Sequence, residues 1–188
     1  MMTNTVEVAT LPEALDRPRL LTMYEGMRTI RTFEDKLHDL FAAGGIPGFV
    51  HLYAGEEAVA VGVMAALEPN DYITSTHRGH GHCIAKGVDL KAMLAELYGK
   101  ETGCAQGKGG SMHLAAPSVG LMGCSAIVSS LIPVAPGDAL ASQMQGRNRG
   151  VVAFFGDGAL DEGVFFESAN FAILKNLPIL FVCEDNGL

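Results

Sequence analysis

The sequence predicts an α/β fold, in which a parallel β-sheet is flanked by helices and preceded by an N-terminal helical segment. The main observation is two continuous apolar runs, residues 151–155 and 179–183, which are typical of strands buried on both faces of a parallel sheet. Residues 162–175 between them carry apolar side chains at helical spacing. Strand, helix and strand in this order form a βαβ unit, whose two strands are parallel. A second observation is the apolar repeat from Leu20 to Phe41, in steps of three and four residues, which predicts a long amphipathic helix.

The N-terminal half divides into a leader and a series of short elements. We expect residues 1–19 to be a leader and residues 20–188 to be one domain whose C-terminal part is missing. The first helix is expected from about residue 18 to residue 43, where two glycines end it. The next elements are expected in this order: a helix at 56–67, a strand at 72–76, an element opened by residues 78–81, and a helix through residue 98 that is capped by Asp89.

Residues 99–126 differ in composition from the rest of the chain. Seven of them are glycines, and the run Lys-Gly-Gly-Ser lies at positions 108–111. The segment is too apolar for a flexible linker, so we expect an ordered loop that approaches another group closely. A helix interrupted by Pro133 and Pro136 is expected to follow it, over residues 128–145.

Composition and charge exclude several classes of protein. Hydrophobic residues make up 48% of the chain and charged residues 18%, which is enough to bury a core. The formal net charge of −8 argues against nucleic-acid binding, which favours a basic surface. No apolar run is long enough to span a membrane, and none resembles a signal peptide. The four cysteines form no CxxC pair, so we expect reduced thiols in a cytoplasmic protein.

Polar residues follow both predicted strands of the βαβ unit. Asp157 stands between two glycines directly after the first strand, and Asn186 closes the second. Ligands of open α/β sheets bind beyond the carboxyl ends of the strands, so both residues are expected at one ligand-binding edge. Their carboxylate and amide oxygens suit Mg²⁺ bound to a phosphate group. Taken alone, a Gly-Asp-Gly sequence is more often a simple strand-to-helix turn. The second oxygen cluster favours the metal site.

Four segments, in order, resemble one family. GDGALDEGVFFESANFAILKNLPILFVCEDN is similar to the thiamine-diphosphate motif, which begins with GDG and ends with NN. GFVHLYAGEEAVAVG, THRGHGH and GKGGSMH precede it and resemble the alpha subunit of the thiamine-diphosphate-dependent decarboxylase component of 2-oxo acid dehydrogenase complexes, of the pyruvate or acetoin type. The resemblance covers roughly residues 20–188 and implies a thiamine-diphosphate-binding fold.

The resemblance implies two sets of cofactor ligands. Mg²⁺ would be bound by Asp157, by the side chain of Asn186 and by the backbone carbonyl of Leu188. Thiamine diphosphate would be contacted by residues of three segments, namely His77, Arg78, Ala126, Val128, Asp157, Gly158, Ala159 and Asn186. A guanidinium at position 78 is physically reasonable, because it pairs with two phosphate oxygens at once.

Several acid–base residues allow more than one interpretation. His51 matches a histidine on the substrate side and is a candidate catalytic residue, although a half-buried structural histidine would also fit its position. His80 is the second catalytic candidate. Because no third ligand lies at a metal-like spacing, His80 and His82 are interpreted as hydrogen-bonded loop histidines. Glu56 and Glu57 suit helix capping as well as acid–base chemistry.

The sequence departs from the family pattern at three places. The double asparagine is Asp185-Asn186 here, which retains the second position as the expected ligand. The segment GNGIVGA reads CSAIVSS here, so Ala126 and Ser129 stand where glycines would let the backbone approach the cofactor. The chain also stops soon after the expected metal loop, and we therefore expect a truncated protein.

The resemblance also implies a reaction and partners. Thiamine diphosphate acts as the electron sink while carbon dioxide leaves a 2-oxo acid, and the acyl group then passes to a lipoyl group. The implied partners are a beta subunit in an alpha2beta2 assembly, which supplies the activating glutamate, and a lipoyl-bearing acyltransferase. The expected substrate is a 2-oxo acid, with pyruvate first, or acetoin. The alternatives are another thiamine-diphosphate enzyme, or a non-catalytic truncated or degenerate paralogue that acts only through subunit pairing.

Overall fold

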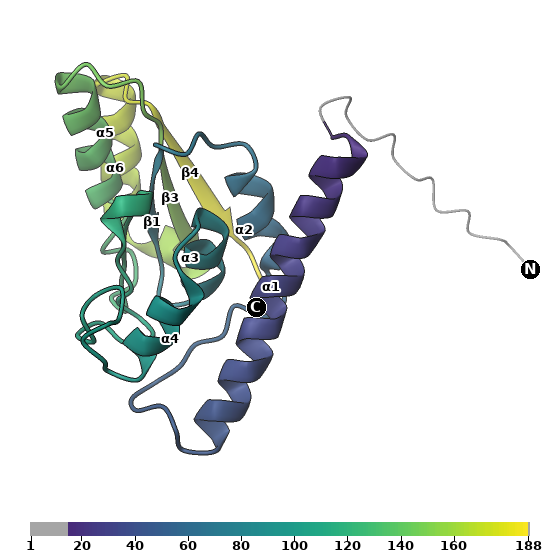
Figure 1. Cartoon of the computed structure of the whole chain (residues 1–188). Coiled ribbons are helices and arrows are strands. Elements are labelled where there is room, and N and C mark those ends of the chain that lie inside the picture. Colours follow the sequence, from purple (N-terminus) through teal and green to yellow (C-terminus); the bar gives the residue numbers. More distant parts are fainter. Residues whose placement is uncertain (1–14, 188) are drawn as a thin grey trace, which may run out of the picture.

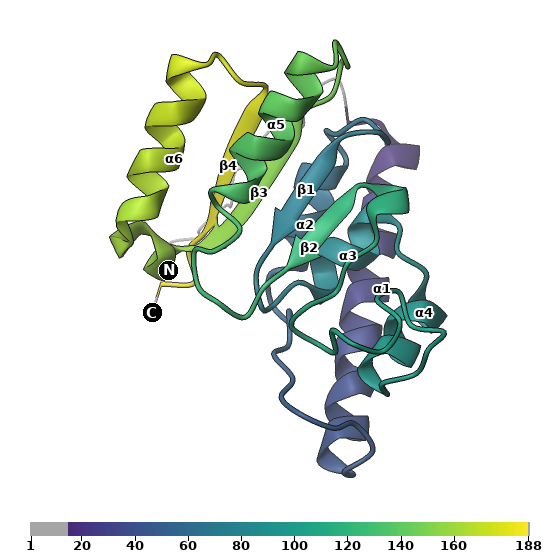
Figure 2. The same ribbon diagram turned by 90° about the vertical axis from the view of Figure 1, so that its left-hand side faces the viewer.

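The computed structural model describes residues 15–187, which form three layers with the sheet in the middle (Figure 1). One face of the sheet is covered by α1 to α4 and the other by α5 and α6 (Figure 2). The helices are α1 (Arg17–Ala42), α2 (Glu57–Met64), α3 (His80–Lys86), α4 (Leu90–Leu97), α5 (Val134–Met144) and α6 (Gly163–Leu174). The strands are β1 (Tyr72–Ser75), β2 (Leu121–Cys124), β3 (Val151–Gly156) and β4 (Ile179–Glu184). Two short 3₁₀ helices, η1 (Pro117–Val119) and η2 (Asp157–Asp161), lie in the connections.

The four strands are parallel and lie in the order β2-β1-β3-β4. The strands β3 and β4 pair from Val151 opposite Ile179 to Gly156 opposite Glu184, and α6 connects them. This confirms the predicted α/β class and the predicted βαβ unit. The expected burial of residues 179–183 on both faces was wrong, because β4 is the edge strand in the described part of the chain and its Leu180 and Cys183 are exposed. The chain passes from β1 to β2 on one side and then returns to β3 on the other side of β1. The boundary between β1 and β3 is therefore a topological switch point, where sheets of this type bind ligands.

The buried strand β3 supplies the core on both faces of the sheet. Val152 and Phe154 pack in the cluster beneath α1 to α4, whereas Val151 and Ala153 pack against α5. Successive side chains of a strand point to opposite faces, so a continuous apolar run is required when both faces are covered.

The helix starts follow from their capping residues. The Asp16 side chain accepts a hydrogen bond from the backbone N–H of Arg19 at 2.9 Å, with Pro18 in the first turn of α1. The predicted cap of α4 is confirmed, because Asp89 accepts from the N–H of Ala92 at 2.8 Å. The helix α1 begins at Arg17, so the expected leader boundary at residue 19 falls inside its first turn. Residues 1–14 of that leader lie outside the described part.

Three expected elements were wrong in detail. The helix expected at 128–145 begins only at Val134, and Pro136 lies in its first turn, where the missing N–H has no helical partner to lose. The segment 99–126 is not all loop, because it contains β2. His80 lies in the first turn of α3 and not in a loop. Within residues 15–187, no helix combines the length and hydropathy that crossing a membrane requires.

Candidate functional site

A pocket lies at the switch point, beyond the carboxyl ends of β1 and β3. Its volume is about 270 Å³. One wall is formed by the residues that follow β1 and by the segment 125–132 after β2, and the other by the ends of β3 and β4. Apolar side chains such as Ile127 and Phe155 line it together with charged ones. The parallel topology alone brings these segments together, because all four strands end at this edge.

Most of the predicted cofactor ligands line this pocket. They are His77, Arg78, Val128, Asp157, Gly158, Ala159 and Asn186. Three predicted site residues do not line it, namely His51, His80 and Ala126, although both neighbours of Ala126 do. The remaining predicted ligand, Leu188, lies outside the described residues.

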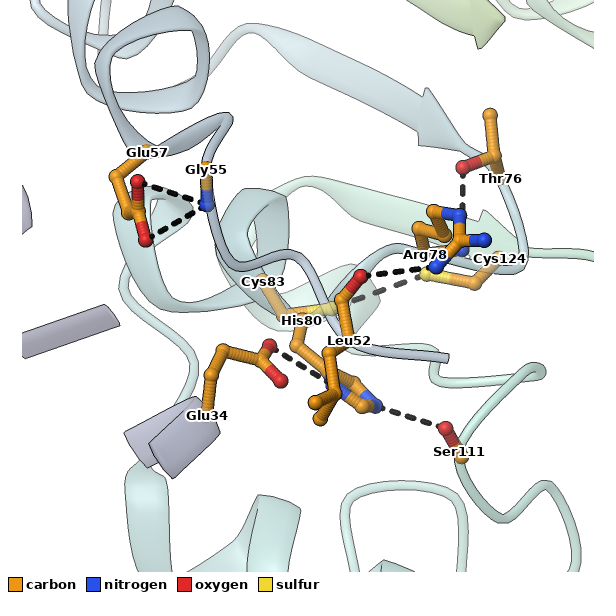
Figure 3. Close-up of polar contacts among 10 residues, drawn as sticks. All are labelled: Glu34, Leu52, Gly55, Glu57, Thr76, Arg78, His80, Cys83, Ser111 and Cys124. Atoms are coloured by element: carbon orange, nitrogen blue, oxygen red, sulfur yellow. Dashed lines mark hydrogen bonds and ion pairs between the residues drawn. The ribbon is translucent and has the colours of Figure 1, made fainter. Parts of the chain in front are cut away.

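Arg78 is the cationic group of the site, and His77 lies beside it in the chain. The Arg78 backbone N–H donates to Thr76 Oγ1 at 3.2 Å, and its guanidinium Nη1 donates to the carbonyl oxygen of Leu52 at 3.1 Å (Figure 3). The His77 ring meets the His51 ring edge-on, with 5.0 Å between ring centroids. Burial lowers the pKa of both histidines, and the charge of Arg78 lowers it further. His51 thus contacts His77, which lines the pocket, but does not line the pocket itself.

Asp157 and Asn186, the two side chains predicted to bind Mg²⁺, both line the pocket. They follow β3 and β4, and the last paired residues of these strands, Gly156 and Glu184, are opposite each other. No described atom lies within 4 Å of the position that a side chain on Gly158 would occupy, so the turn after Asp157 is open to a ligand. Among residues 15–187 there is no group of three acidic, histidine or cysteine side chains that could hold a metal ion by themselves. The donor set fits Mg²⁺ that is held partly by phosphate oxygens.

A group of side chains that are hydrogen-bonded around Glu184 was not predicted from the sequence. This carboxylate lines the pocket, and its Oε1 accepts hydrogen bonds from the hydroxyl of Tyr53 and from His82 Nε2, the latter at 3.1 Å. The Ser75 hydroxyl lies 2.7 Å from His82 Nδ1. Burial alone would raise the pKa of Glu184, but the hydrogen bonds from His82 and Tyr53 lower it overall. Because these residues are up to 131 positions apart, the only signal in the sequence was a glutamate at the end of an apolar strand.

The hydrogen-bonding partners of the adjacent residues Glu56 and Glu57 differ. Glu57 forms an ion pair with Arg31 at 2.6 Å and accepts from the backbone N–H of Gly55 at 3.1 Å. Glu56 precedes α2 at its N-cap position, but its side chain makes no capping hydrogen bond and it lines the pocket. The expected capping by Glu56 was wrong, Glu57 holds Arg31 and Gly55 instead, and an acid–base role for Glu56 stays a prediction.

His80 is fully buried between two partners. Its Nδ1 lies 2.9 Å from Glu34 Oε1, and its Nε2 lies 2.9 Å from the Ser111 hydroxyl (Figure 3). Although a carboxylate, an imidazole and a hydroxyl are in line here, none of the three lines the pocket. This geometry favours the hydrogen-bonded interpretation of His80, in which it joins α1 to the glycine-rich segment 99–126.

Comparison with known proteins assigns the family. The model of the dehydrogenase E1 component family matches residues 25–188. The chain belongs to this family. It is 55% identical over 179 residues to the alpha subunit of acetoin:2,6-dichlorophenolindophenol oxidoreductase of Cupriavidus necator, which covers 95% of this chain and 53% of that protein. The corresponding subunit of Bacillus subtilis is 55% identical over 174 residues, covering 93% of this chain and 52% of the relative.

Pyruvate dehydrogenase subunits are more distant relatives. The E1 component subunit alpha of Porphyra purpurea is 44% identical over 179 residues, covering 92% of this chain and 52% of that protein. The chain thus spans about half the length of the curated relatives that it matches. A solved structure of a putative thiamin diphosphate-dependent enzyme from Mycobacterium smegmatis overlaps with 73% of this chain and 22% of its own, at 18% identity and a TM-score of 0.48.

The glycine-rich segment 99–126 of this E1 chain is held in place by the buried carboxylate of Glu96. Glu96 accepts hydrogen bonds from the backbone N–H groups of Ala105, Gly107, Gly109 and Gly110, at 2.7 to 3.2 Å. Burial would raise the pKa of Glu96, but these four donors lower it overall. Glycine is required at position 109, because a Cβ there would lie 2.1 Å from the carbonyl oxygen of His113. The expectation of an ordered, closely packed segment is confirmed.

The pocket wall also explains one departure from the family pattern. Ser129 replaces an expected glycine, yet it has a φ of 67°. This left-handed conformation is the one that glycine adopts at little cost. Its hydroxyl lies 3.4 Å from the carbonyl oxygen of Ala159, across the pocket. The glycine-like backbone is therefore retained at this position, with some strain.

Proposed function

We propose that this chain is the cofactor-binding alpha subunit of a dehydrogenase E1 component, and that it binds the Mg²⁺-diphosphate end of thiamine diphosphate. The observation that supports this most directly is the pocket at the switch point, which is lined by Arg78 as well as by Asp157 and Asn186. A cation-binding pair of oxygens and a guanidinium suit a metal-bound diphosphate. Membership of the E1 family supports the same ligand.

The residues of this chain would bind and orient the cofactor. When bound, thiamine diphosphate supplies the electron sink for breaking a carbon–carbon bond next to a carbonyl group. Arg78 and His77 would contact the diphosphate together with the backbone at Gly158 and Ala159. Asp157 and Asn186 would hold Mg²⁺, with the carbonyl of Leu188 as a third protein ligand. The backbone at Ala126 and Val128 would meet the aminopyrimidine ring.

The substrate side of the pocket would be formed around His51. This histidine lies against His77, so it can orient a substrate that approaches the diphosphate end from that side. The proposed reactions are cleavage of acetoin or oxidative decarboxylation of a 2-oxo acid such as pyruvate. Acetoin is favoured, because the relatives named for acetoin are 55% identical and the pyruvate dehydrogenase subunit of Porphyra is 44% identical.

The proposed partners follow from the same family. Relatives of this chain are named as alpha subunits. We propose a beta subunit that completes the site with the activating glutamate in an alpha2beta2 assembly. The acyl group would be transferred to a lipoyl-bearing acyltransferase, and the site of action would be the cytoplasm.

The test is reconstitution of the full-length chain with its beta subunit. Thiamine diphosphate binding is measured by titration calorimetry with and without Mg²⁺. Turnover of acetoin and of pyruvate is measured with 2,6-dichlorophenolindophenol as the electron acceptor. Tight binding that requires Mg²⁺, together with turnover of either substrate, is the expected result. Formation of the assembly without cofactor binding would contradict the proposal and would support the non-catalytic alternative.

A further inference from the structure

The side chain of Glu56 has no structural task in the described part of the chain. It stands at the N-cap position of α2, where a side chain normally accepts a hydrogen bond from the first turn, but it makes no such bond. The adjacent Glu57 stabilises this corner instead, through an ion pair with Arg31. Glu57 also accepts from the backbone N–H of Gly55, as Figure 3 shows. Glu56 is half-buried and lines the pocket. Its carboxylate is therefore available to a ligand.

The backbone around Glu56 is held in place on both sides. The Glu56 N–H donates to the carbonyl oxygen of Tyr53 at 3.2 Å, and its own carbonyl accepts from Val59 at 2.9 Å. The Tyr53 hydroxyl is bound by Glu184, and the Leu52 carbonyl accepts from Arg78 (Figure 3). A carboxylate carried by such a fixed loop keeps its position relative to the proposed diphosphate site.

The surroundings of Glu56 suit a proton acceptor. Burial raises the pKa of Glu56, and the neighbouring carboxylates of Glu184 and Glu57 add to this effect. Arg78 and His82 lower it in part. A carboxylate whose pKa lies closer to neutrality is a more effective general base at physiological pH. Perturbed acids in a cleft are frequent at catalytic sites.

We propose that Glu56 is the general base that removes the hydroxyl proton when an α-hydroxyketone such as acetoin is cleaved. This rests on the proposed function. In this cleavage the bond between the carbonyl carbon and the carbinol carbon breaks, and bound thiamine diphosphate would supply the electron sink for its electron pair. The O–H bond of the carbinol breaks as well, and its electron pair forms the carbonyl group of the released aldehyde. The proton goes to the carboxylate of Glu56. The remaining two-carbon unit is at the oxidation level of an aldehyde, and the two-electron acceptor, which is the dye in the assay, would oxidise it to the acetyl level.

Decarboxylation of a 2-oxo acid does not need a general base at the step that breaks the carbon–carbon bond. The leaving carboxylate is already deprotonated, so no base is needed when carbon dioxide departs. A negative charge on Glu56 would instead repel the carboxylate of the incoming substrate. Glu56 should thus promote one of the two proposed reactions and hinder the other, which separates its role from that of residues that merely bind the cofactor.

The experiment is Glu56→Gln in the full-length chain assembled with its beta subunit. Acetaldehyde release from acetoin and carbon dioxide release from pyruvate are measured with the same dye as acceptor. Thiamine diphosphate affinity is measured by titration calorimetry, and Glu56→Gln should leave it unchanged, whereas weaker binding would show that Glu56 holds the cofactor and would overturn the inference. We expect kcat for acetoin to fall by about 100-fold or more, as is usual for loss of a general base, while kcat/KM for pyruvate is unchanged or higher. Glu101→Gln is the matched control, because it removes the same charge from an exposed turn outside the pocket.

Each other outcome overturns the inference in a recognisable way. If the Glu56→Gln enzyme cleaves acetoin at the original rate, Glu56 is not the base. Equal loss of both activities would also overturn it, because Glu56 would then serve a step that the two reactions share. A wild-type enzyme that acts only on 2-oxo acids overturns the inference and leaves the proposed function standing. A correctly assembled wild-type enzyme that acts on neither substrate contradicts both.

Discussion

The guanidinium of Arg78 donates a hydrogen bond of 3.1 Å to the carbonyl oxygen of Leu52. This contact joins Arg78, which is proposed to bind the diphosphate, to the loop that carries His51 and Glu56. One side chain thereby links the segment that follows β1 to the loop whose Glu56 also lines the pocket. Substitutions at this position should affect both cofactor binding and the order of the loop.

Arg78→Ala should weaken thiamine diphosphate binding by about 10-fold to 100-fold, because a charged hydrogen-bonding partner is lost. Arg78→Lys should retain part of the affinity, since a lysine keeps the charge without the planar fork. Titration calorimetry on the assembled enzyme measures both. Arg147→Ala, which changes an exposed arginine outside the pocket, should leave the affinity unaltered. An Arg78→Ala enzyme with unchanged affinity would remove Arg78 from the site.

Asp157→Ala should abolish Mg²⁺-dependent thiamine diphosphate binding, because it removes the only charged protein ligand proposed for the metal. The melting temperature should change little, since Asp157 lies beyond the end of β3 and not in the core. The matched control is Asp161→Ala, an exposed aspartate of the same 3₁₀ helix that does not line the pocket. If the assembled Asp157→Ala enzyme still needs Mg²⁺ and binds the cofactor equally well, the metal assignment is wrong.

Glu96→Gln should loosen the glycine-rich segment, because an amide accepts fewer hydrogen bonds than the carboxylate that now receives four. We expect a loss of about 3 kcal/mol in the free energy of unfolding, measured with denaturant. Hydrogen exchange should rise at residues 105–110 first. Unchanged exchange there would show that other contacts hold the segment.

The same carboxylate predicts an acid-sensitive segment. The pKa of Glu96 is lower in the folded protein than its ordinary value of 4.5, so its stabilising effect is fully present above that value. The effect should disappear as the pH falls from 4.5 through the lower pKa of the folded state. Hydrogen exchange at residues 105–110, followed between about pH 6 and pH 3 and corrected for intrinsic rates, measures this. The Glu96→Gln variant should lack this dependence.

His80→Asn should destabilise the fold by about 2 to 4 kcal/mol, because it breaks a buried bridge between Glu34 and Ser111. Activity per folded molecule should be affected less than stability. Comparing turnover with the folded fraction, measured by circular dichroism at the assay temperature, distinguishes the two roles. Loss of turnover in a fully folded variant would instead support His80 as a catalytic residue.

Ser129→Gly should stabilise the chain by about 0.5 to 1 kcal/mol, since glycine adopts the left-handed conformation at this position without strain. The lost hydroxyl contact with Ala159 is long, at 3.4 Å, and offsets little of this gain. The midpoint of denaturant unfolding is the measurement. A lower midpoint would mean that the hydroxyl contact outweighs the strain.

The sequence by itself determined the βαβ unit and the residues at its carboxyl edge. Apolar runs buried on both faces, such as 151–155, have a pattern that depends only on local composition, and the position of Asp157 follows directly from the strand before it. The ordered motifs likewise determined the family, which the match to residues 25–188 confirmed. The strand β2 was missed, because four residues that include Gly123 carry too short a pattern.

Only the tertiary structure decided which of two adjacent or similar residues faces the pocket. Glu56 and Glu57 are identical in type, and a rotation of about 100° per residue at a helix start directs one to the pocket and the other to Arg31. His80 is removed from the pocket by partners 46 and 31 positions away. Glu184 is held at the pocket by a hydrogen bond from the hydroxyl of Tyr53, which is 131 positions away in the sequence. Such long-range contacts depend on how the layers pack, and local sequence patterns carry no information about them.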